Sequence, residues 1–280
     1  MKTSRKHRHS AAAYLLALLA TTTYGLSLGV LPACAAPADA GKALTIAMHY
    51  VVPPFVDGSK VRTPEAIDTA LAKQLADKLH TTFQAIPLAN TNADTDAPQS
   101  HGPADVALTT LTGNQVVPAS SQVIATGYAS RPMAIMRSDT NIKSWSQLKG
   151  RIVCMAEGGR YVGTMAQQYG AIEKILRAPA DSLLTLRTGG CDAAVHDDVM
   201  LDELLKLPEW KKYSATLTTP ITAKAPLVFT VPTGSAQVVT AVKDLTREWH
   251  AKNYLTALNK KRVRDIAFEV YLDQAVPDCH

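Results

Sequence analysis

Short apolar segments alternate with longer segments of helical periodicity along most of the chain. In the first half, apolar residues recur at four-residue spacing and predict one face of a helix: Ile67, Leu71, Leu75 and Leu79. Thr63 is the expected N-cap of this helix, and Pro64 suits its first position. Apolar, β-prone runs predict the strands around it, at 43–48, 82–88 and 105–111.

The second half of the chain continues this alternation. Runs of apolar residues predict strands at 132–137, 151–156, 173–177, 191–195 and 227–231. Helices are predicted between or after them, at 164–171, 179–190, 198–207, 235–251 and 254–263. The order strand, helix, strand is typical of α/β proteins with parallel sheets. We therefore expect an α/β protein built from two such units.

The stretch LRTGGCDAAVHDD, residues 186–198, places charged groups where one predicted strand ends. A helix ends at the glycine pair, strand 191–195 follows, and His196, Asp197 and Asp198 come directly after it. In open α/β sheets, ligands bind outside the carboxyl ends of parallel strands. These residues are therefore candidates for ligand binding, and a strand end that faces only water is the alternative.

Residues 1–35 have the pattern of a signal peptide. Basic residues come first, the apolar run 11–31 follows, and Ala33-Cys34-Ala35 fits a cleavage site. We therefore expect export to the periplasm. The residues before Cys34 also resemble a lipobox, so lipid attachment at Cys34 is an alternative. A retained membrane anchor is a second alternative, which the threonines and glycines within the apolar run disfavour.

Composition narrows the functional classes. The chain has 280 residues, 46% of them hydrophobic and 19% charged, which suffices for one large or two small domains. Its formal net charge of +5 falls to about +1 without the predicted signal peptide. No basic stripe with interleaved aromatic residues is present, so the sequence does not predict nucleic-acid binding. The glycine-rich turn EGGRYVG lacks nucleotide-site spacing, and no cofactor is expected.

The four cysteines are Cys34, Cys154, Cys191 and Cys279. No two of them have the C-x-x-C spacing of zinc or redox sites. Counted back from their strand ends, Cys154 and Cys191 differ by about 10 Å along the strands. This offset argues against a disulfide between them, and the pairing of the cysteines after residue 35 is left open.

Several segments, in this order, resemble bacterial extracellular solute-binding proteins of family 3, the periplasmic receptors of amino-acid ABC importers. Three come from the first half: LTIAMHYVVPPF, EAIDTALAKQLADKL and ADVALTTLT. Two more are LKGRIVCMAEGG and the return strand and helix KAPLVFTVPTGSAQVVTAVKDLTREW. The most specific match is L-x-x-G-x-x-D-A-x-x-x-D, on Leu186, Gly189, Asp192, Ala193 and Asp197. The resemblance covers residues 43–264.

The resemblance implies an α/β, two-lobed periplasmic-binding-protein fold of type II, with a hinge between the lobes. Lobe 1 is expected at 41–128 plus 226–280, and lobe 2 at 129–225. The chain would cross between them near 129–132 and again near 223–226. The resemblance also implies a monomer whose partners are a small-molecule solute and the membrane subunits of an ABC transporter.

A ligand site between the lobes is implied as well, in which Asp197 holds the ammonium group of the solute. Thr110 and Thr112 would donate to the solute's carboxylate, but the arginine that the family places nearby is absent, and Gln115 stands nearest. Arg160 either restores the positive charge or is a solvated surface residue. The full expected set is His49, Tyr50, Phe55, Thr110, Thr112, Gln115, Gly158, Gly159, Arg160 and Asp197.

Other positions near this site have separate expectations. His49 stands where the family often has an aspartate. Gly158 and Gly159 allow close backbone approach at a helix start. His196 points away from Asp197 by strand alternation, and it is expected to have a satisfied hydrogen bond rather than a ligand. Asp198 is likewise not expected to contact the solute.

Three functions follow from this interpretation. The expected one is a periplasmic receptor, not an enzyme, that delivers an amino acid or a related small polar solute to an ABC importer. The first alternative is a receptor-like accessory protein that docks on a periplasmic oxidoreductase or sensor, which the incomplete ligand set favours. The second is a periplasmic dehydratase on the same fold, with His49, Glu157 and Asp197 as acid–base groups.

Overall fold

The structure is a computed structural model, and it describes residues 42–49, 60–88, 104–111, 117–218 and 224–273. Within these residues the strands form two five-stranded mixed sheets, each covered by helices. This arrangement confirms the expected α/β class. None of the helices in the described ranges is long and apolar enough to cross a membrane.

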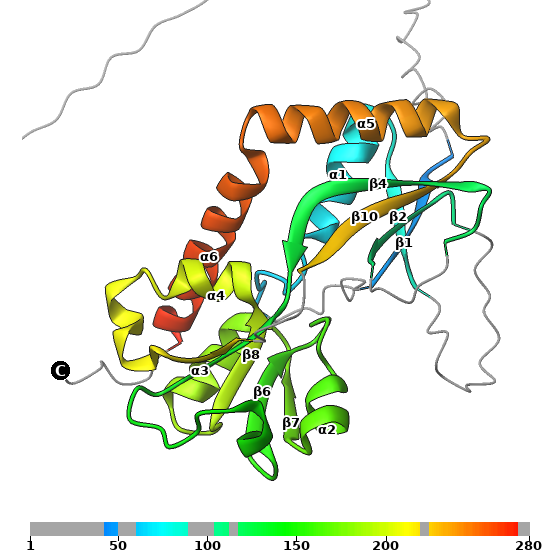
Figure 1. The fold of residues 1–280 in the computed structure, drawn as a ribbon. Helices are drawn as coiled ribbons and strands as arrows, with labels where there is room; N and C mark the ends of the chain where they lie inside the picture. The colour runs from blue at the N-terminus through cyan, green and yellow to red at the C-terminus, as the bar shows by residue number, and fades with distance from the viewer. Residues whose placement is uncertain (1–41, 50–59, 89–103, 112–116, 219–223, 274–280) are drawn as a thin grey trace, which may run out of the picture. The chain divides into compact units, whose positions relative to one another are not determined.

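The first sheet has the strand order β2-β1-β3-β10-β4 (Figure 1). β1 pairs in parallel with β2 and β3, as is typical of strands joined through a helix, whereas β10 runs antiparallel to β3 and β4. Helices α1 (Asp68–Lys78) and α5 (Ala236–Ala251) pack against this sheet and against each other. The strands are β1 (Leu44–Met48), β2 (Phe83–Pro87), β3 (Val106–Thr110), β4 (Ser121–Ser130) and β10 (Ala225–Pro232).

The apolar face predicted for the first helix is buried in the core of this sheet. Ile67, Leu71 and Leu75 lie within one hydrophobic cluster with residues of β1, β3 and β10, and Leu79 packs at its edge. From α5, Trp249 enters the same cluster, and its ring is tilted against that of Phe229 of β10. Burial of this stripe, rather than helix propensity, is therefore the main stabilisation of α1.

The second sheet has the order β7-β6-β8-β5-β9. β6 pairs in parallel with β7 and β8, and β5 runs antiparallel to β8 and β9. Its strands are β5 (Pro132–Met136), β6 (Ile152–Ala156), β7 (Ile172–Leu176), β8 (Ala193–Asp197) and β9 (Ala215–Thr218). The accompanying helices are η1 (Trp145–Leu148), α2 (Thr164–Tyr169), α3 (Pro179–Arg187), α4 (Asp198–Leu204), η2 (Pro208–Tyr213) and α6 (Tyr254–Leu272).

The C-terminal helix α6 contacts the helices of the second sheet. It packs on α3 and α4, and Val263, Ile266 and Val270 are buried in the hydrophobic cluster on that side. In the sequence, α6 follows α5, which packs on the first sheet. The lobe limits 41–128 plus 226–280 and 129–225 stay a prediction.

The expected start of the first helix is wrong. The helix begins at Asp68, its N-cap is Ile67, and Thr63 does not cap it. Instead, the backbone N–H and the hydroxyl of Thr63 donate to the carboxylate of Glu269 in α6. Contacts to a distant helix thus outweigh the local capping preference, and residues 63–67 form a separate segment ahead of α1.

Two strands were not among those predicted, β4 and β9. Burial along β4 alternates from Val123 onwards, but the buried side carries the polar Thr126 and Ser130 while the apolar Val123 is exposed. Such a strand lacks the alternation of apolar and polar residues by which a strand is recognised in a sequence. Gly127 within it has a left-handed φ of 91°. The pairing of β4 with β10 places Ser130 opposite Ala225, where the chain returns to the first sheet.

Cys154 and Cys191 form a disulfide, so the expectation against this pairing is wrong. Their Cα atoms lie 5.9 Å apart, in the usual range for a disulfide. The strand-rise argument failed because Cys191 lies before β8, outside any strand, so the rise per residue of a strand does not apply to it. Cys34 and Cys279 lie outside the described residues.

Candidate functional site

Three consecutive residues at the carboxyl end of β8 contact three different sets of partners. His196 and Asp197 are the last residues of β8, and Asp198 is the first residue of α4. All three are buried. Because strand side chains alternate and the chain then turns into a helix, the three side chains leave the backbone in different directions. Each therefore joins β8 to a different part of the molecule.

His196 is held between two buried side chains. Its Nδ1 lies 2.8 Å from Oε2 of Glu65, and its Nε2 lies 2.7 Å from Oγ of Ser182. Ser182 donates to the carbonyl oxygen of Pro179 at 2.9 Å, so Nε2 of His196 donates to Ser182. A single proton then lies between Nδ1 of His196 and Oε2 of Glu65. The expectation of a histidine with satisfied hydrogen bonds is confirmed.

Asp197 accepts hydrogen bonds from three internal donors. The hydroxyl of Tyr128 donates to Oδ2 at 2.6 Å, and the hydroxyl of Tyr161 donates to Oδ1 at 2.8 Å. Nη1 of Arg160 donates to Oδ2 at 3.1 Å. The residue is only 6% exposed, so these bonds replace the water that a free carboxylate would bind.

The guanidinium of Arg160 bridges two carboxylates. Besides Asp197, it donates through Nη2 to Oδ1 of Asp68 at 2.9 Å and through Nη1 to Oγ of Ser130 at 3.2 Å. It also lies over the ring of Tyr128, 5.4 Å from the ring centroid. Its side chain is 8% exposed, so the alternative of a solvated surface arginine is wrong. We call Asp68, Tyr128, Ser130, Tyr161 and Asp197 the Arg160 site.

The electrostatics of the Arg160 site keep Asp197 and Arg160 ionised. Burial acts to raise the pKa of Asp197, but the charge of Arg160 and the hydroxyl donors prevail and hold that pKa below its usual value. Burial acts to lower the pKa of Arg160, and the two carboxylates more than offset it. For Asp68 burial prevails, and its pKa is raised despite Arg160. Burial, and then the charge of Asp197, raise the pKa values of Tyr128 and Tyr161, so both hydroxyls remain donors.

Some polar side-chain atoms of the described residues are buried without a hydrogen-bond partner in the structure. They include Oδ2 of Asp68, Nε of Arg160 and Oγ1 of Thr110. The first two atoms belong to the ion pair between Asp68 and Arg160. Within the part of the chain that the structure describes, no group of histidine, cysteine, aspartate and glutamate side chains is arranged to hold a metal ion.

Asp198 connects the two segments where the chain was expected to cross between lobes. Its carboxylate accepts from Nε of Arg131 at 3.1 Å and from the backbone N–H of Arg131 at 3.2 Å. Nζ of Lys224 lies 3.0 Å from the same carboxylate. Arg131 lies between β4 and β5, and Lys224 directly precedes β10. Asp198 is therefore a structural anchor, at a position where no role was expected.

The expected ligand residues have different placements. Arg160 and Asp197 are in direct contact, and Thr110 ends β3 with a buried hydroxyl. Gly158 has a left-handed φ of 75°, and a Cβ on Gly159 would meet the carbonyl oxygen of Ala156 at 2.9 Å. His49 is exposed. Four members lie outside the described residues: Tyr50, Phe55, Thr112 and Gln115.

Four of the five members of the Arg160 site were not among the expected ligand residues. Asp68 is the first residue of α1. Tyr128 and Ser130 lie on one face of β4, a strand that the sequence pattern did not reveal. Tyr161 directly follows Arg160 in the turn EGGRYVG, so its proximity to a binding arginine was available as a signal.

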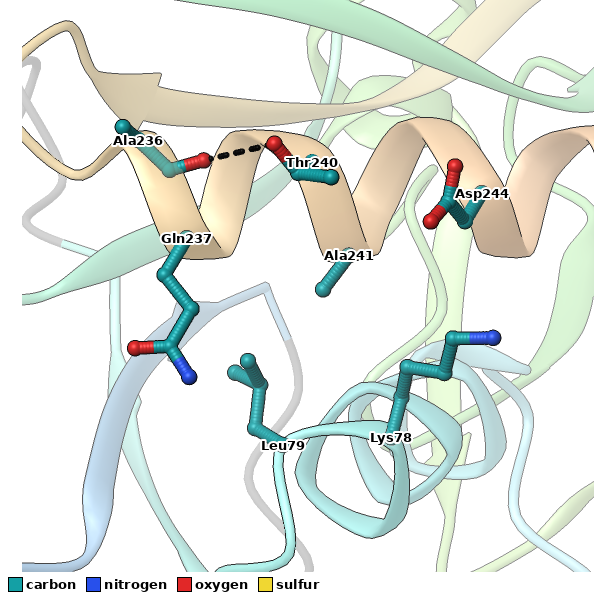
Figure 2. Close-up of a pocket in the computed structure, with 7 residues that line it drawn as sticks. All are labelled: Lys78, Leu79, Ala236, Gln237, Thr240, Ala241 and Asp244. Carbon is teal, nitrogen blue, oxygen red and sulfur yellow. Dashed lines mark hydrogen bonds between the residues drawn. The ribbon is translucent and has the colours of Figure 1, made fainter.

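A separate pocket lies at the opposite end of α1 from Asp68. Its volume is about 400 Å³, and Figure 2 shows side chains of α5 facing the last turn of α1 across it. Lys78 at its edge pairs with Glu248 at 2.6 Å, and Thr240 donates to the carbonyl of Ala236. We assign no ligand to it, because it contains none of the expected residues. Its lining is Lys78, Leu79, Ala236, Gln237, Thr240, Ala241 and Asp244.

Comparison with solved structures defines the class of fold. The chain has the two-lobed fold of periplasmic substrate-binding proteins. One similar structure is a reconstructed ancestral cationic amino-acid solute-binding protein, with a TM-score of 0.50 and 18% identity over 79% of this chain and 95% of that one. Another is an amino-acid ABC transporter substrate-binding protein from Streptococcus pneumoniae bound to L-arginine, with a TM-score of 0.50 and 16% identity over 79% and 94%. No protein-family model matches the chain, and no curated protein matches it.

Proposed function

We propose that the chain is an exported solute-binding receptor that delivers an amino acid or a related small polar solute, cationic in its preferred form, to the membrane subunits of an ABC importer. The observation that carries this proposal is the carboxylate of Asp197. It lies at the carboxyl end of a parallel strand and accepts hydrogen bonds from a guanidinium group. The similar structures named above are amino-acid-binding proteins, which supports the same class of solute.

The remaining parts of the proposal follow from the sequence. Residues 1–35 serve as a signal peptide, the mature protein is a periplasmic monomer, and no cofactor takes part. The solute is held by Asp197 together with Thr110, the glycine turn and the residues expected around 49–55 and 112–115. Solute contacts to both sheets would favour the closed form only through the difference in affinity between the two forms.

Thermal-shift measurements on the purified protein test the receptor proposal. We expect saturable stabilisation by at least one cationic amino acid or amine, and weaker or no stabilisation by simple carboxylates. Asp197→Asn should weaken that solute at least ten-fold, which corresponds to about 1.4 kcal/mol. Folded protein that responds to none of these compounds would contradict the proposal, and an unchanged affinity in the variant would exclude Asp197 from the site.

One observation favours the accessory-protein alternative. Within the described residues, three side chains of the protein itself donate to Asp197, so this carboxylate is hydrogen-bonded without a solute. A protein of this kind would co-purify from the periplasm with an oxidoreductase or sensor rather than with importer subunits. The dehydratase alternative lacks comparable support, because His49 and Glu157 are exposed whereas Asp197 is buried. Turnover of a prephenate-like acid by the purified protein would be needed to support the dehydratase alternative.

A further inference from the structure

We propose that Arg160 is an internal occupant of a guanidinium-binding site, so that the chain binds its own side chain where a free cation would otherwise bind. The inference stands independently of the transport function, because it concerns a contact within the chain.

The composition of the Arg160 site matches a guanidinium group on several sides. Carboxylates of Asp68 and Asp197 accept from the two terminal nitrogens, Nη2 and Nη1. The hydroxyl of Ser130 accepts a further hydrogen bond, and the ring of Tyr128 lies against the guanidinium face. Paired carboxylates and an aromatic face are the usual means of recognising this planar cation.

The occupant comes from a turn rather than from a rigid element. Arg160 lies between the end of β6 at Ala156 and the start of α2 at Thr164. Gly158 and Gly163 in this turn have left-handed φ angles of 75° and 85°. The position of Arg160 therefore depends on a short turn in which two glycines have left-handed conformations. Its partners Asp68, Tyr128 and Asp197 belong instead to a helix and two strands.

The partners of Arg160 come from both sheets. Asp68 starts α1, which packs on the first sheet, and Tyr128 and Ser130 belong to β4 of that sheet. Asp197 ends β8 of the second sheet, and Arg160 itself follows β6 of the same sheet. The guanidinium therefore connects the two sheets without any solute.

Internal occupation lowers the apparent affinity for a competing cation. A solute binds the carboxylates only in the fraction of molecules from which Arg160 has withdrawn, and its apparent dissociation constant rises by the inverse of that fraction. Truncation of Arg160 removes the competitor and leaves both carboxylates in place. The truncated protein should then accept a small guanidinium ion from solution.

The test uses the full chain with Arg160→Ala and methylguanidinium as the probe. We expect calorimetry to show methylguanidinium binding to the variant at least ten-fold more tightly than to the unaltered protein, with a matching saturable rise in Tm. Methylammonium at equal ionic strength should produce a smaller effect, because its compact ammonium group lacks the planar fork of N–H donors that fits both carboxylates and the ring of Tyr128. Arg137→Ala is the matched control, since Arg137 pairs with Asp139 on an exposed surface and its loss should not create binding.

Two further variants keep the inference falsifiable. Arg160→Ala combined with Asp197→Asn should lose the gained binding. If Arg160→Ala does not fold alone, methylguanidinium should restore its folding, with Arg160→Lys as the folded reference. A folded Arg160→Ala protein that binds methylguanidinium no better than the unaltered chain would overturn the inference, and so would failure of the probe to restore an unfolded one. Gain of binding without any amino-acid binding by the unaltered chain would contradict only the receptor proposal.

Discussion

At the scale of residues, the end of β8 concentrates buried ionisable side chains that are individually unfavourable in a protein interior. The cost of burying Asp197 is offset by hydrogen bonds from one guanidinium and two tyrosine hydroxyls. The cost of burying His196 is offset by hydrogen bonds with one carboxylate and one serine. Burial of an ion without such partners costs several kcal/mol. The identity of each partner therefore matters more here than the apolar packing around it.

Asp197→Asn should destabilise the protein even without any solute. The change removes the negative charge that Arg160 and the two tyrosines face, and the loss of one member of a buried pair costs about 3–5 kcal/mol. Urea denaturation would measure it as a lower unfolding free energy. Asp139→Asn is the control, because Asp139 pairs with Arg137 at the surface and should leave stability unchanged. Equal stability of both variants would contradict the buried pairing.

Asp68 and Asp197 should affect the pH dependence of stability with opposite signs. The native pKa of Asp197 is lowered, so its contribution is full above the unfolded pKa of about 4 and is lost as the pH falls further. The native pKa of Asp68 is raised, so its contribution is full below about pH 4 and is lost as the pH rises through that raised pKa.

Unfolding free energies of both variants between about pH 3 and 7 would test this. Relative to the unaltered chain, Asp68→Asn should gain stability as the pH rises, whereas Asp197→Asn should lose it. Parallel pH profiles for the two variants would show that the two carboxyl groups share one environment, contrary to the structure.

The sequence predicted the position of this site better than its contents. A strand followed directly by His196, Asp197 and Asp198 was expected from the apolar run and the glycine pair before it. The structure has His196 and Asp197 as the last residues of β8 and Asp198 as the first residue of α4. The partners could not be predicted, because Arg160 is separated from Asp197 by 37 positions and from Asp68 by 92. Local patterns carry no information on such contacts.

At the scale of elements, the predicted strands and helices of the described residues mostly agree with the structure, and the failures have a common cause. The start of α1 and the disulfide both depend on contacts with distant segments, namely Glu269 with Thr63 and Cys191 with Cys154. β4 escaped prediction because its buried side carries the polar Thr126 and Ser130, so apolar and polar residues do not alternate along it. Periodicity thus predicts an element where the buried face is uniformly apolar, and it fails where that face carries polar residues or where long-range pairs determine the local chain path.

The disulfide should contribute substantially to the stability of the second sheet. It joins β6 to the turn before β8 across 37 positions, a loop whose closure is worth at most about 4 kcal/mol in the chain-entropy account. Cys154→Ser combined with Cys191→Ser should lower Tm, and a reductant should lower the Tm of the unaltered protein towards the same value. If a reductant also lowered the Tm of the double variant, the change in Tm would have a cause other than this disulfide.

At the scale of the whole molecule, Asp198 connects both passages of the chain between the two sheets. Arg131 belongs to the passage from β4 to β5, and Lys224 to the return towards β10. A single buried carboxylate therefore restrains both passages together. In a receptor that opens and closes, these passages are where the change in backbone angles would occur.

Asp198→Asn should loosen both passages together. Hydrogen exchange followed by mass spectrometry should show amides near 129–132 and 224–226 exchanging at least ten-fold faster, equivalent to about 1.4 kcal/mol of opening free energy. Asp202→Asn on the same helix α4 is the control, since Asp202 is exposed. Acceleration at only one passage would show that Asp198 does not couple them.

The chain of charges Asp68–Arg160–Asp197 has a consequence for efforts to redesign the specificity of this protein. Loss of Arg160 leaves the buried carboxylate of Asp197 without its cation, and loss of Asp197 takes the ionised partner from Arg160. A library that varies these two positions one at a time would therefore lose folded members before it found new binders. Productive variants are expected to change two or three of these positions at once, with the total charge kept constant.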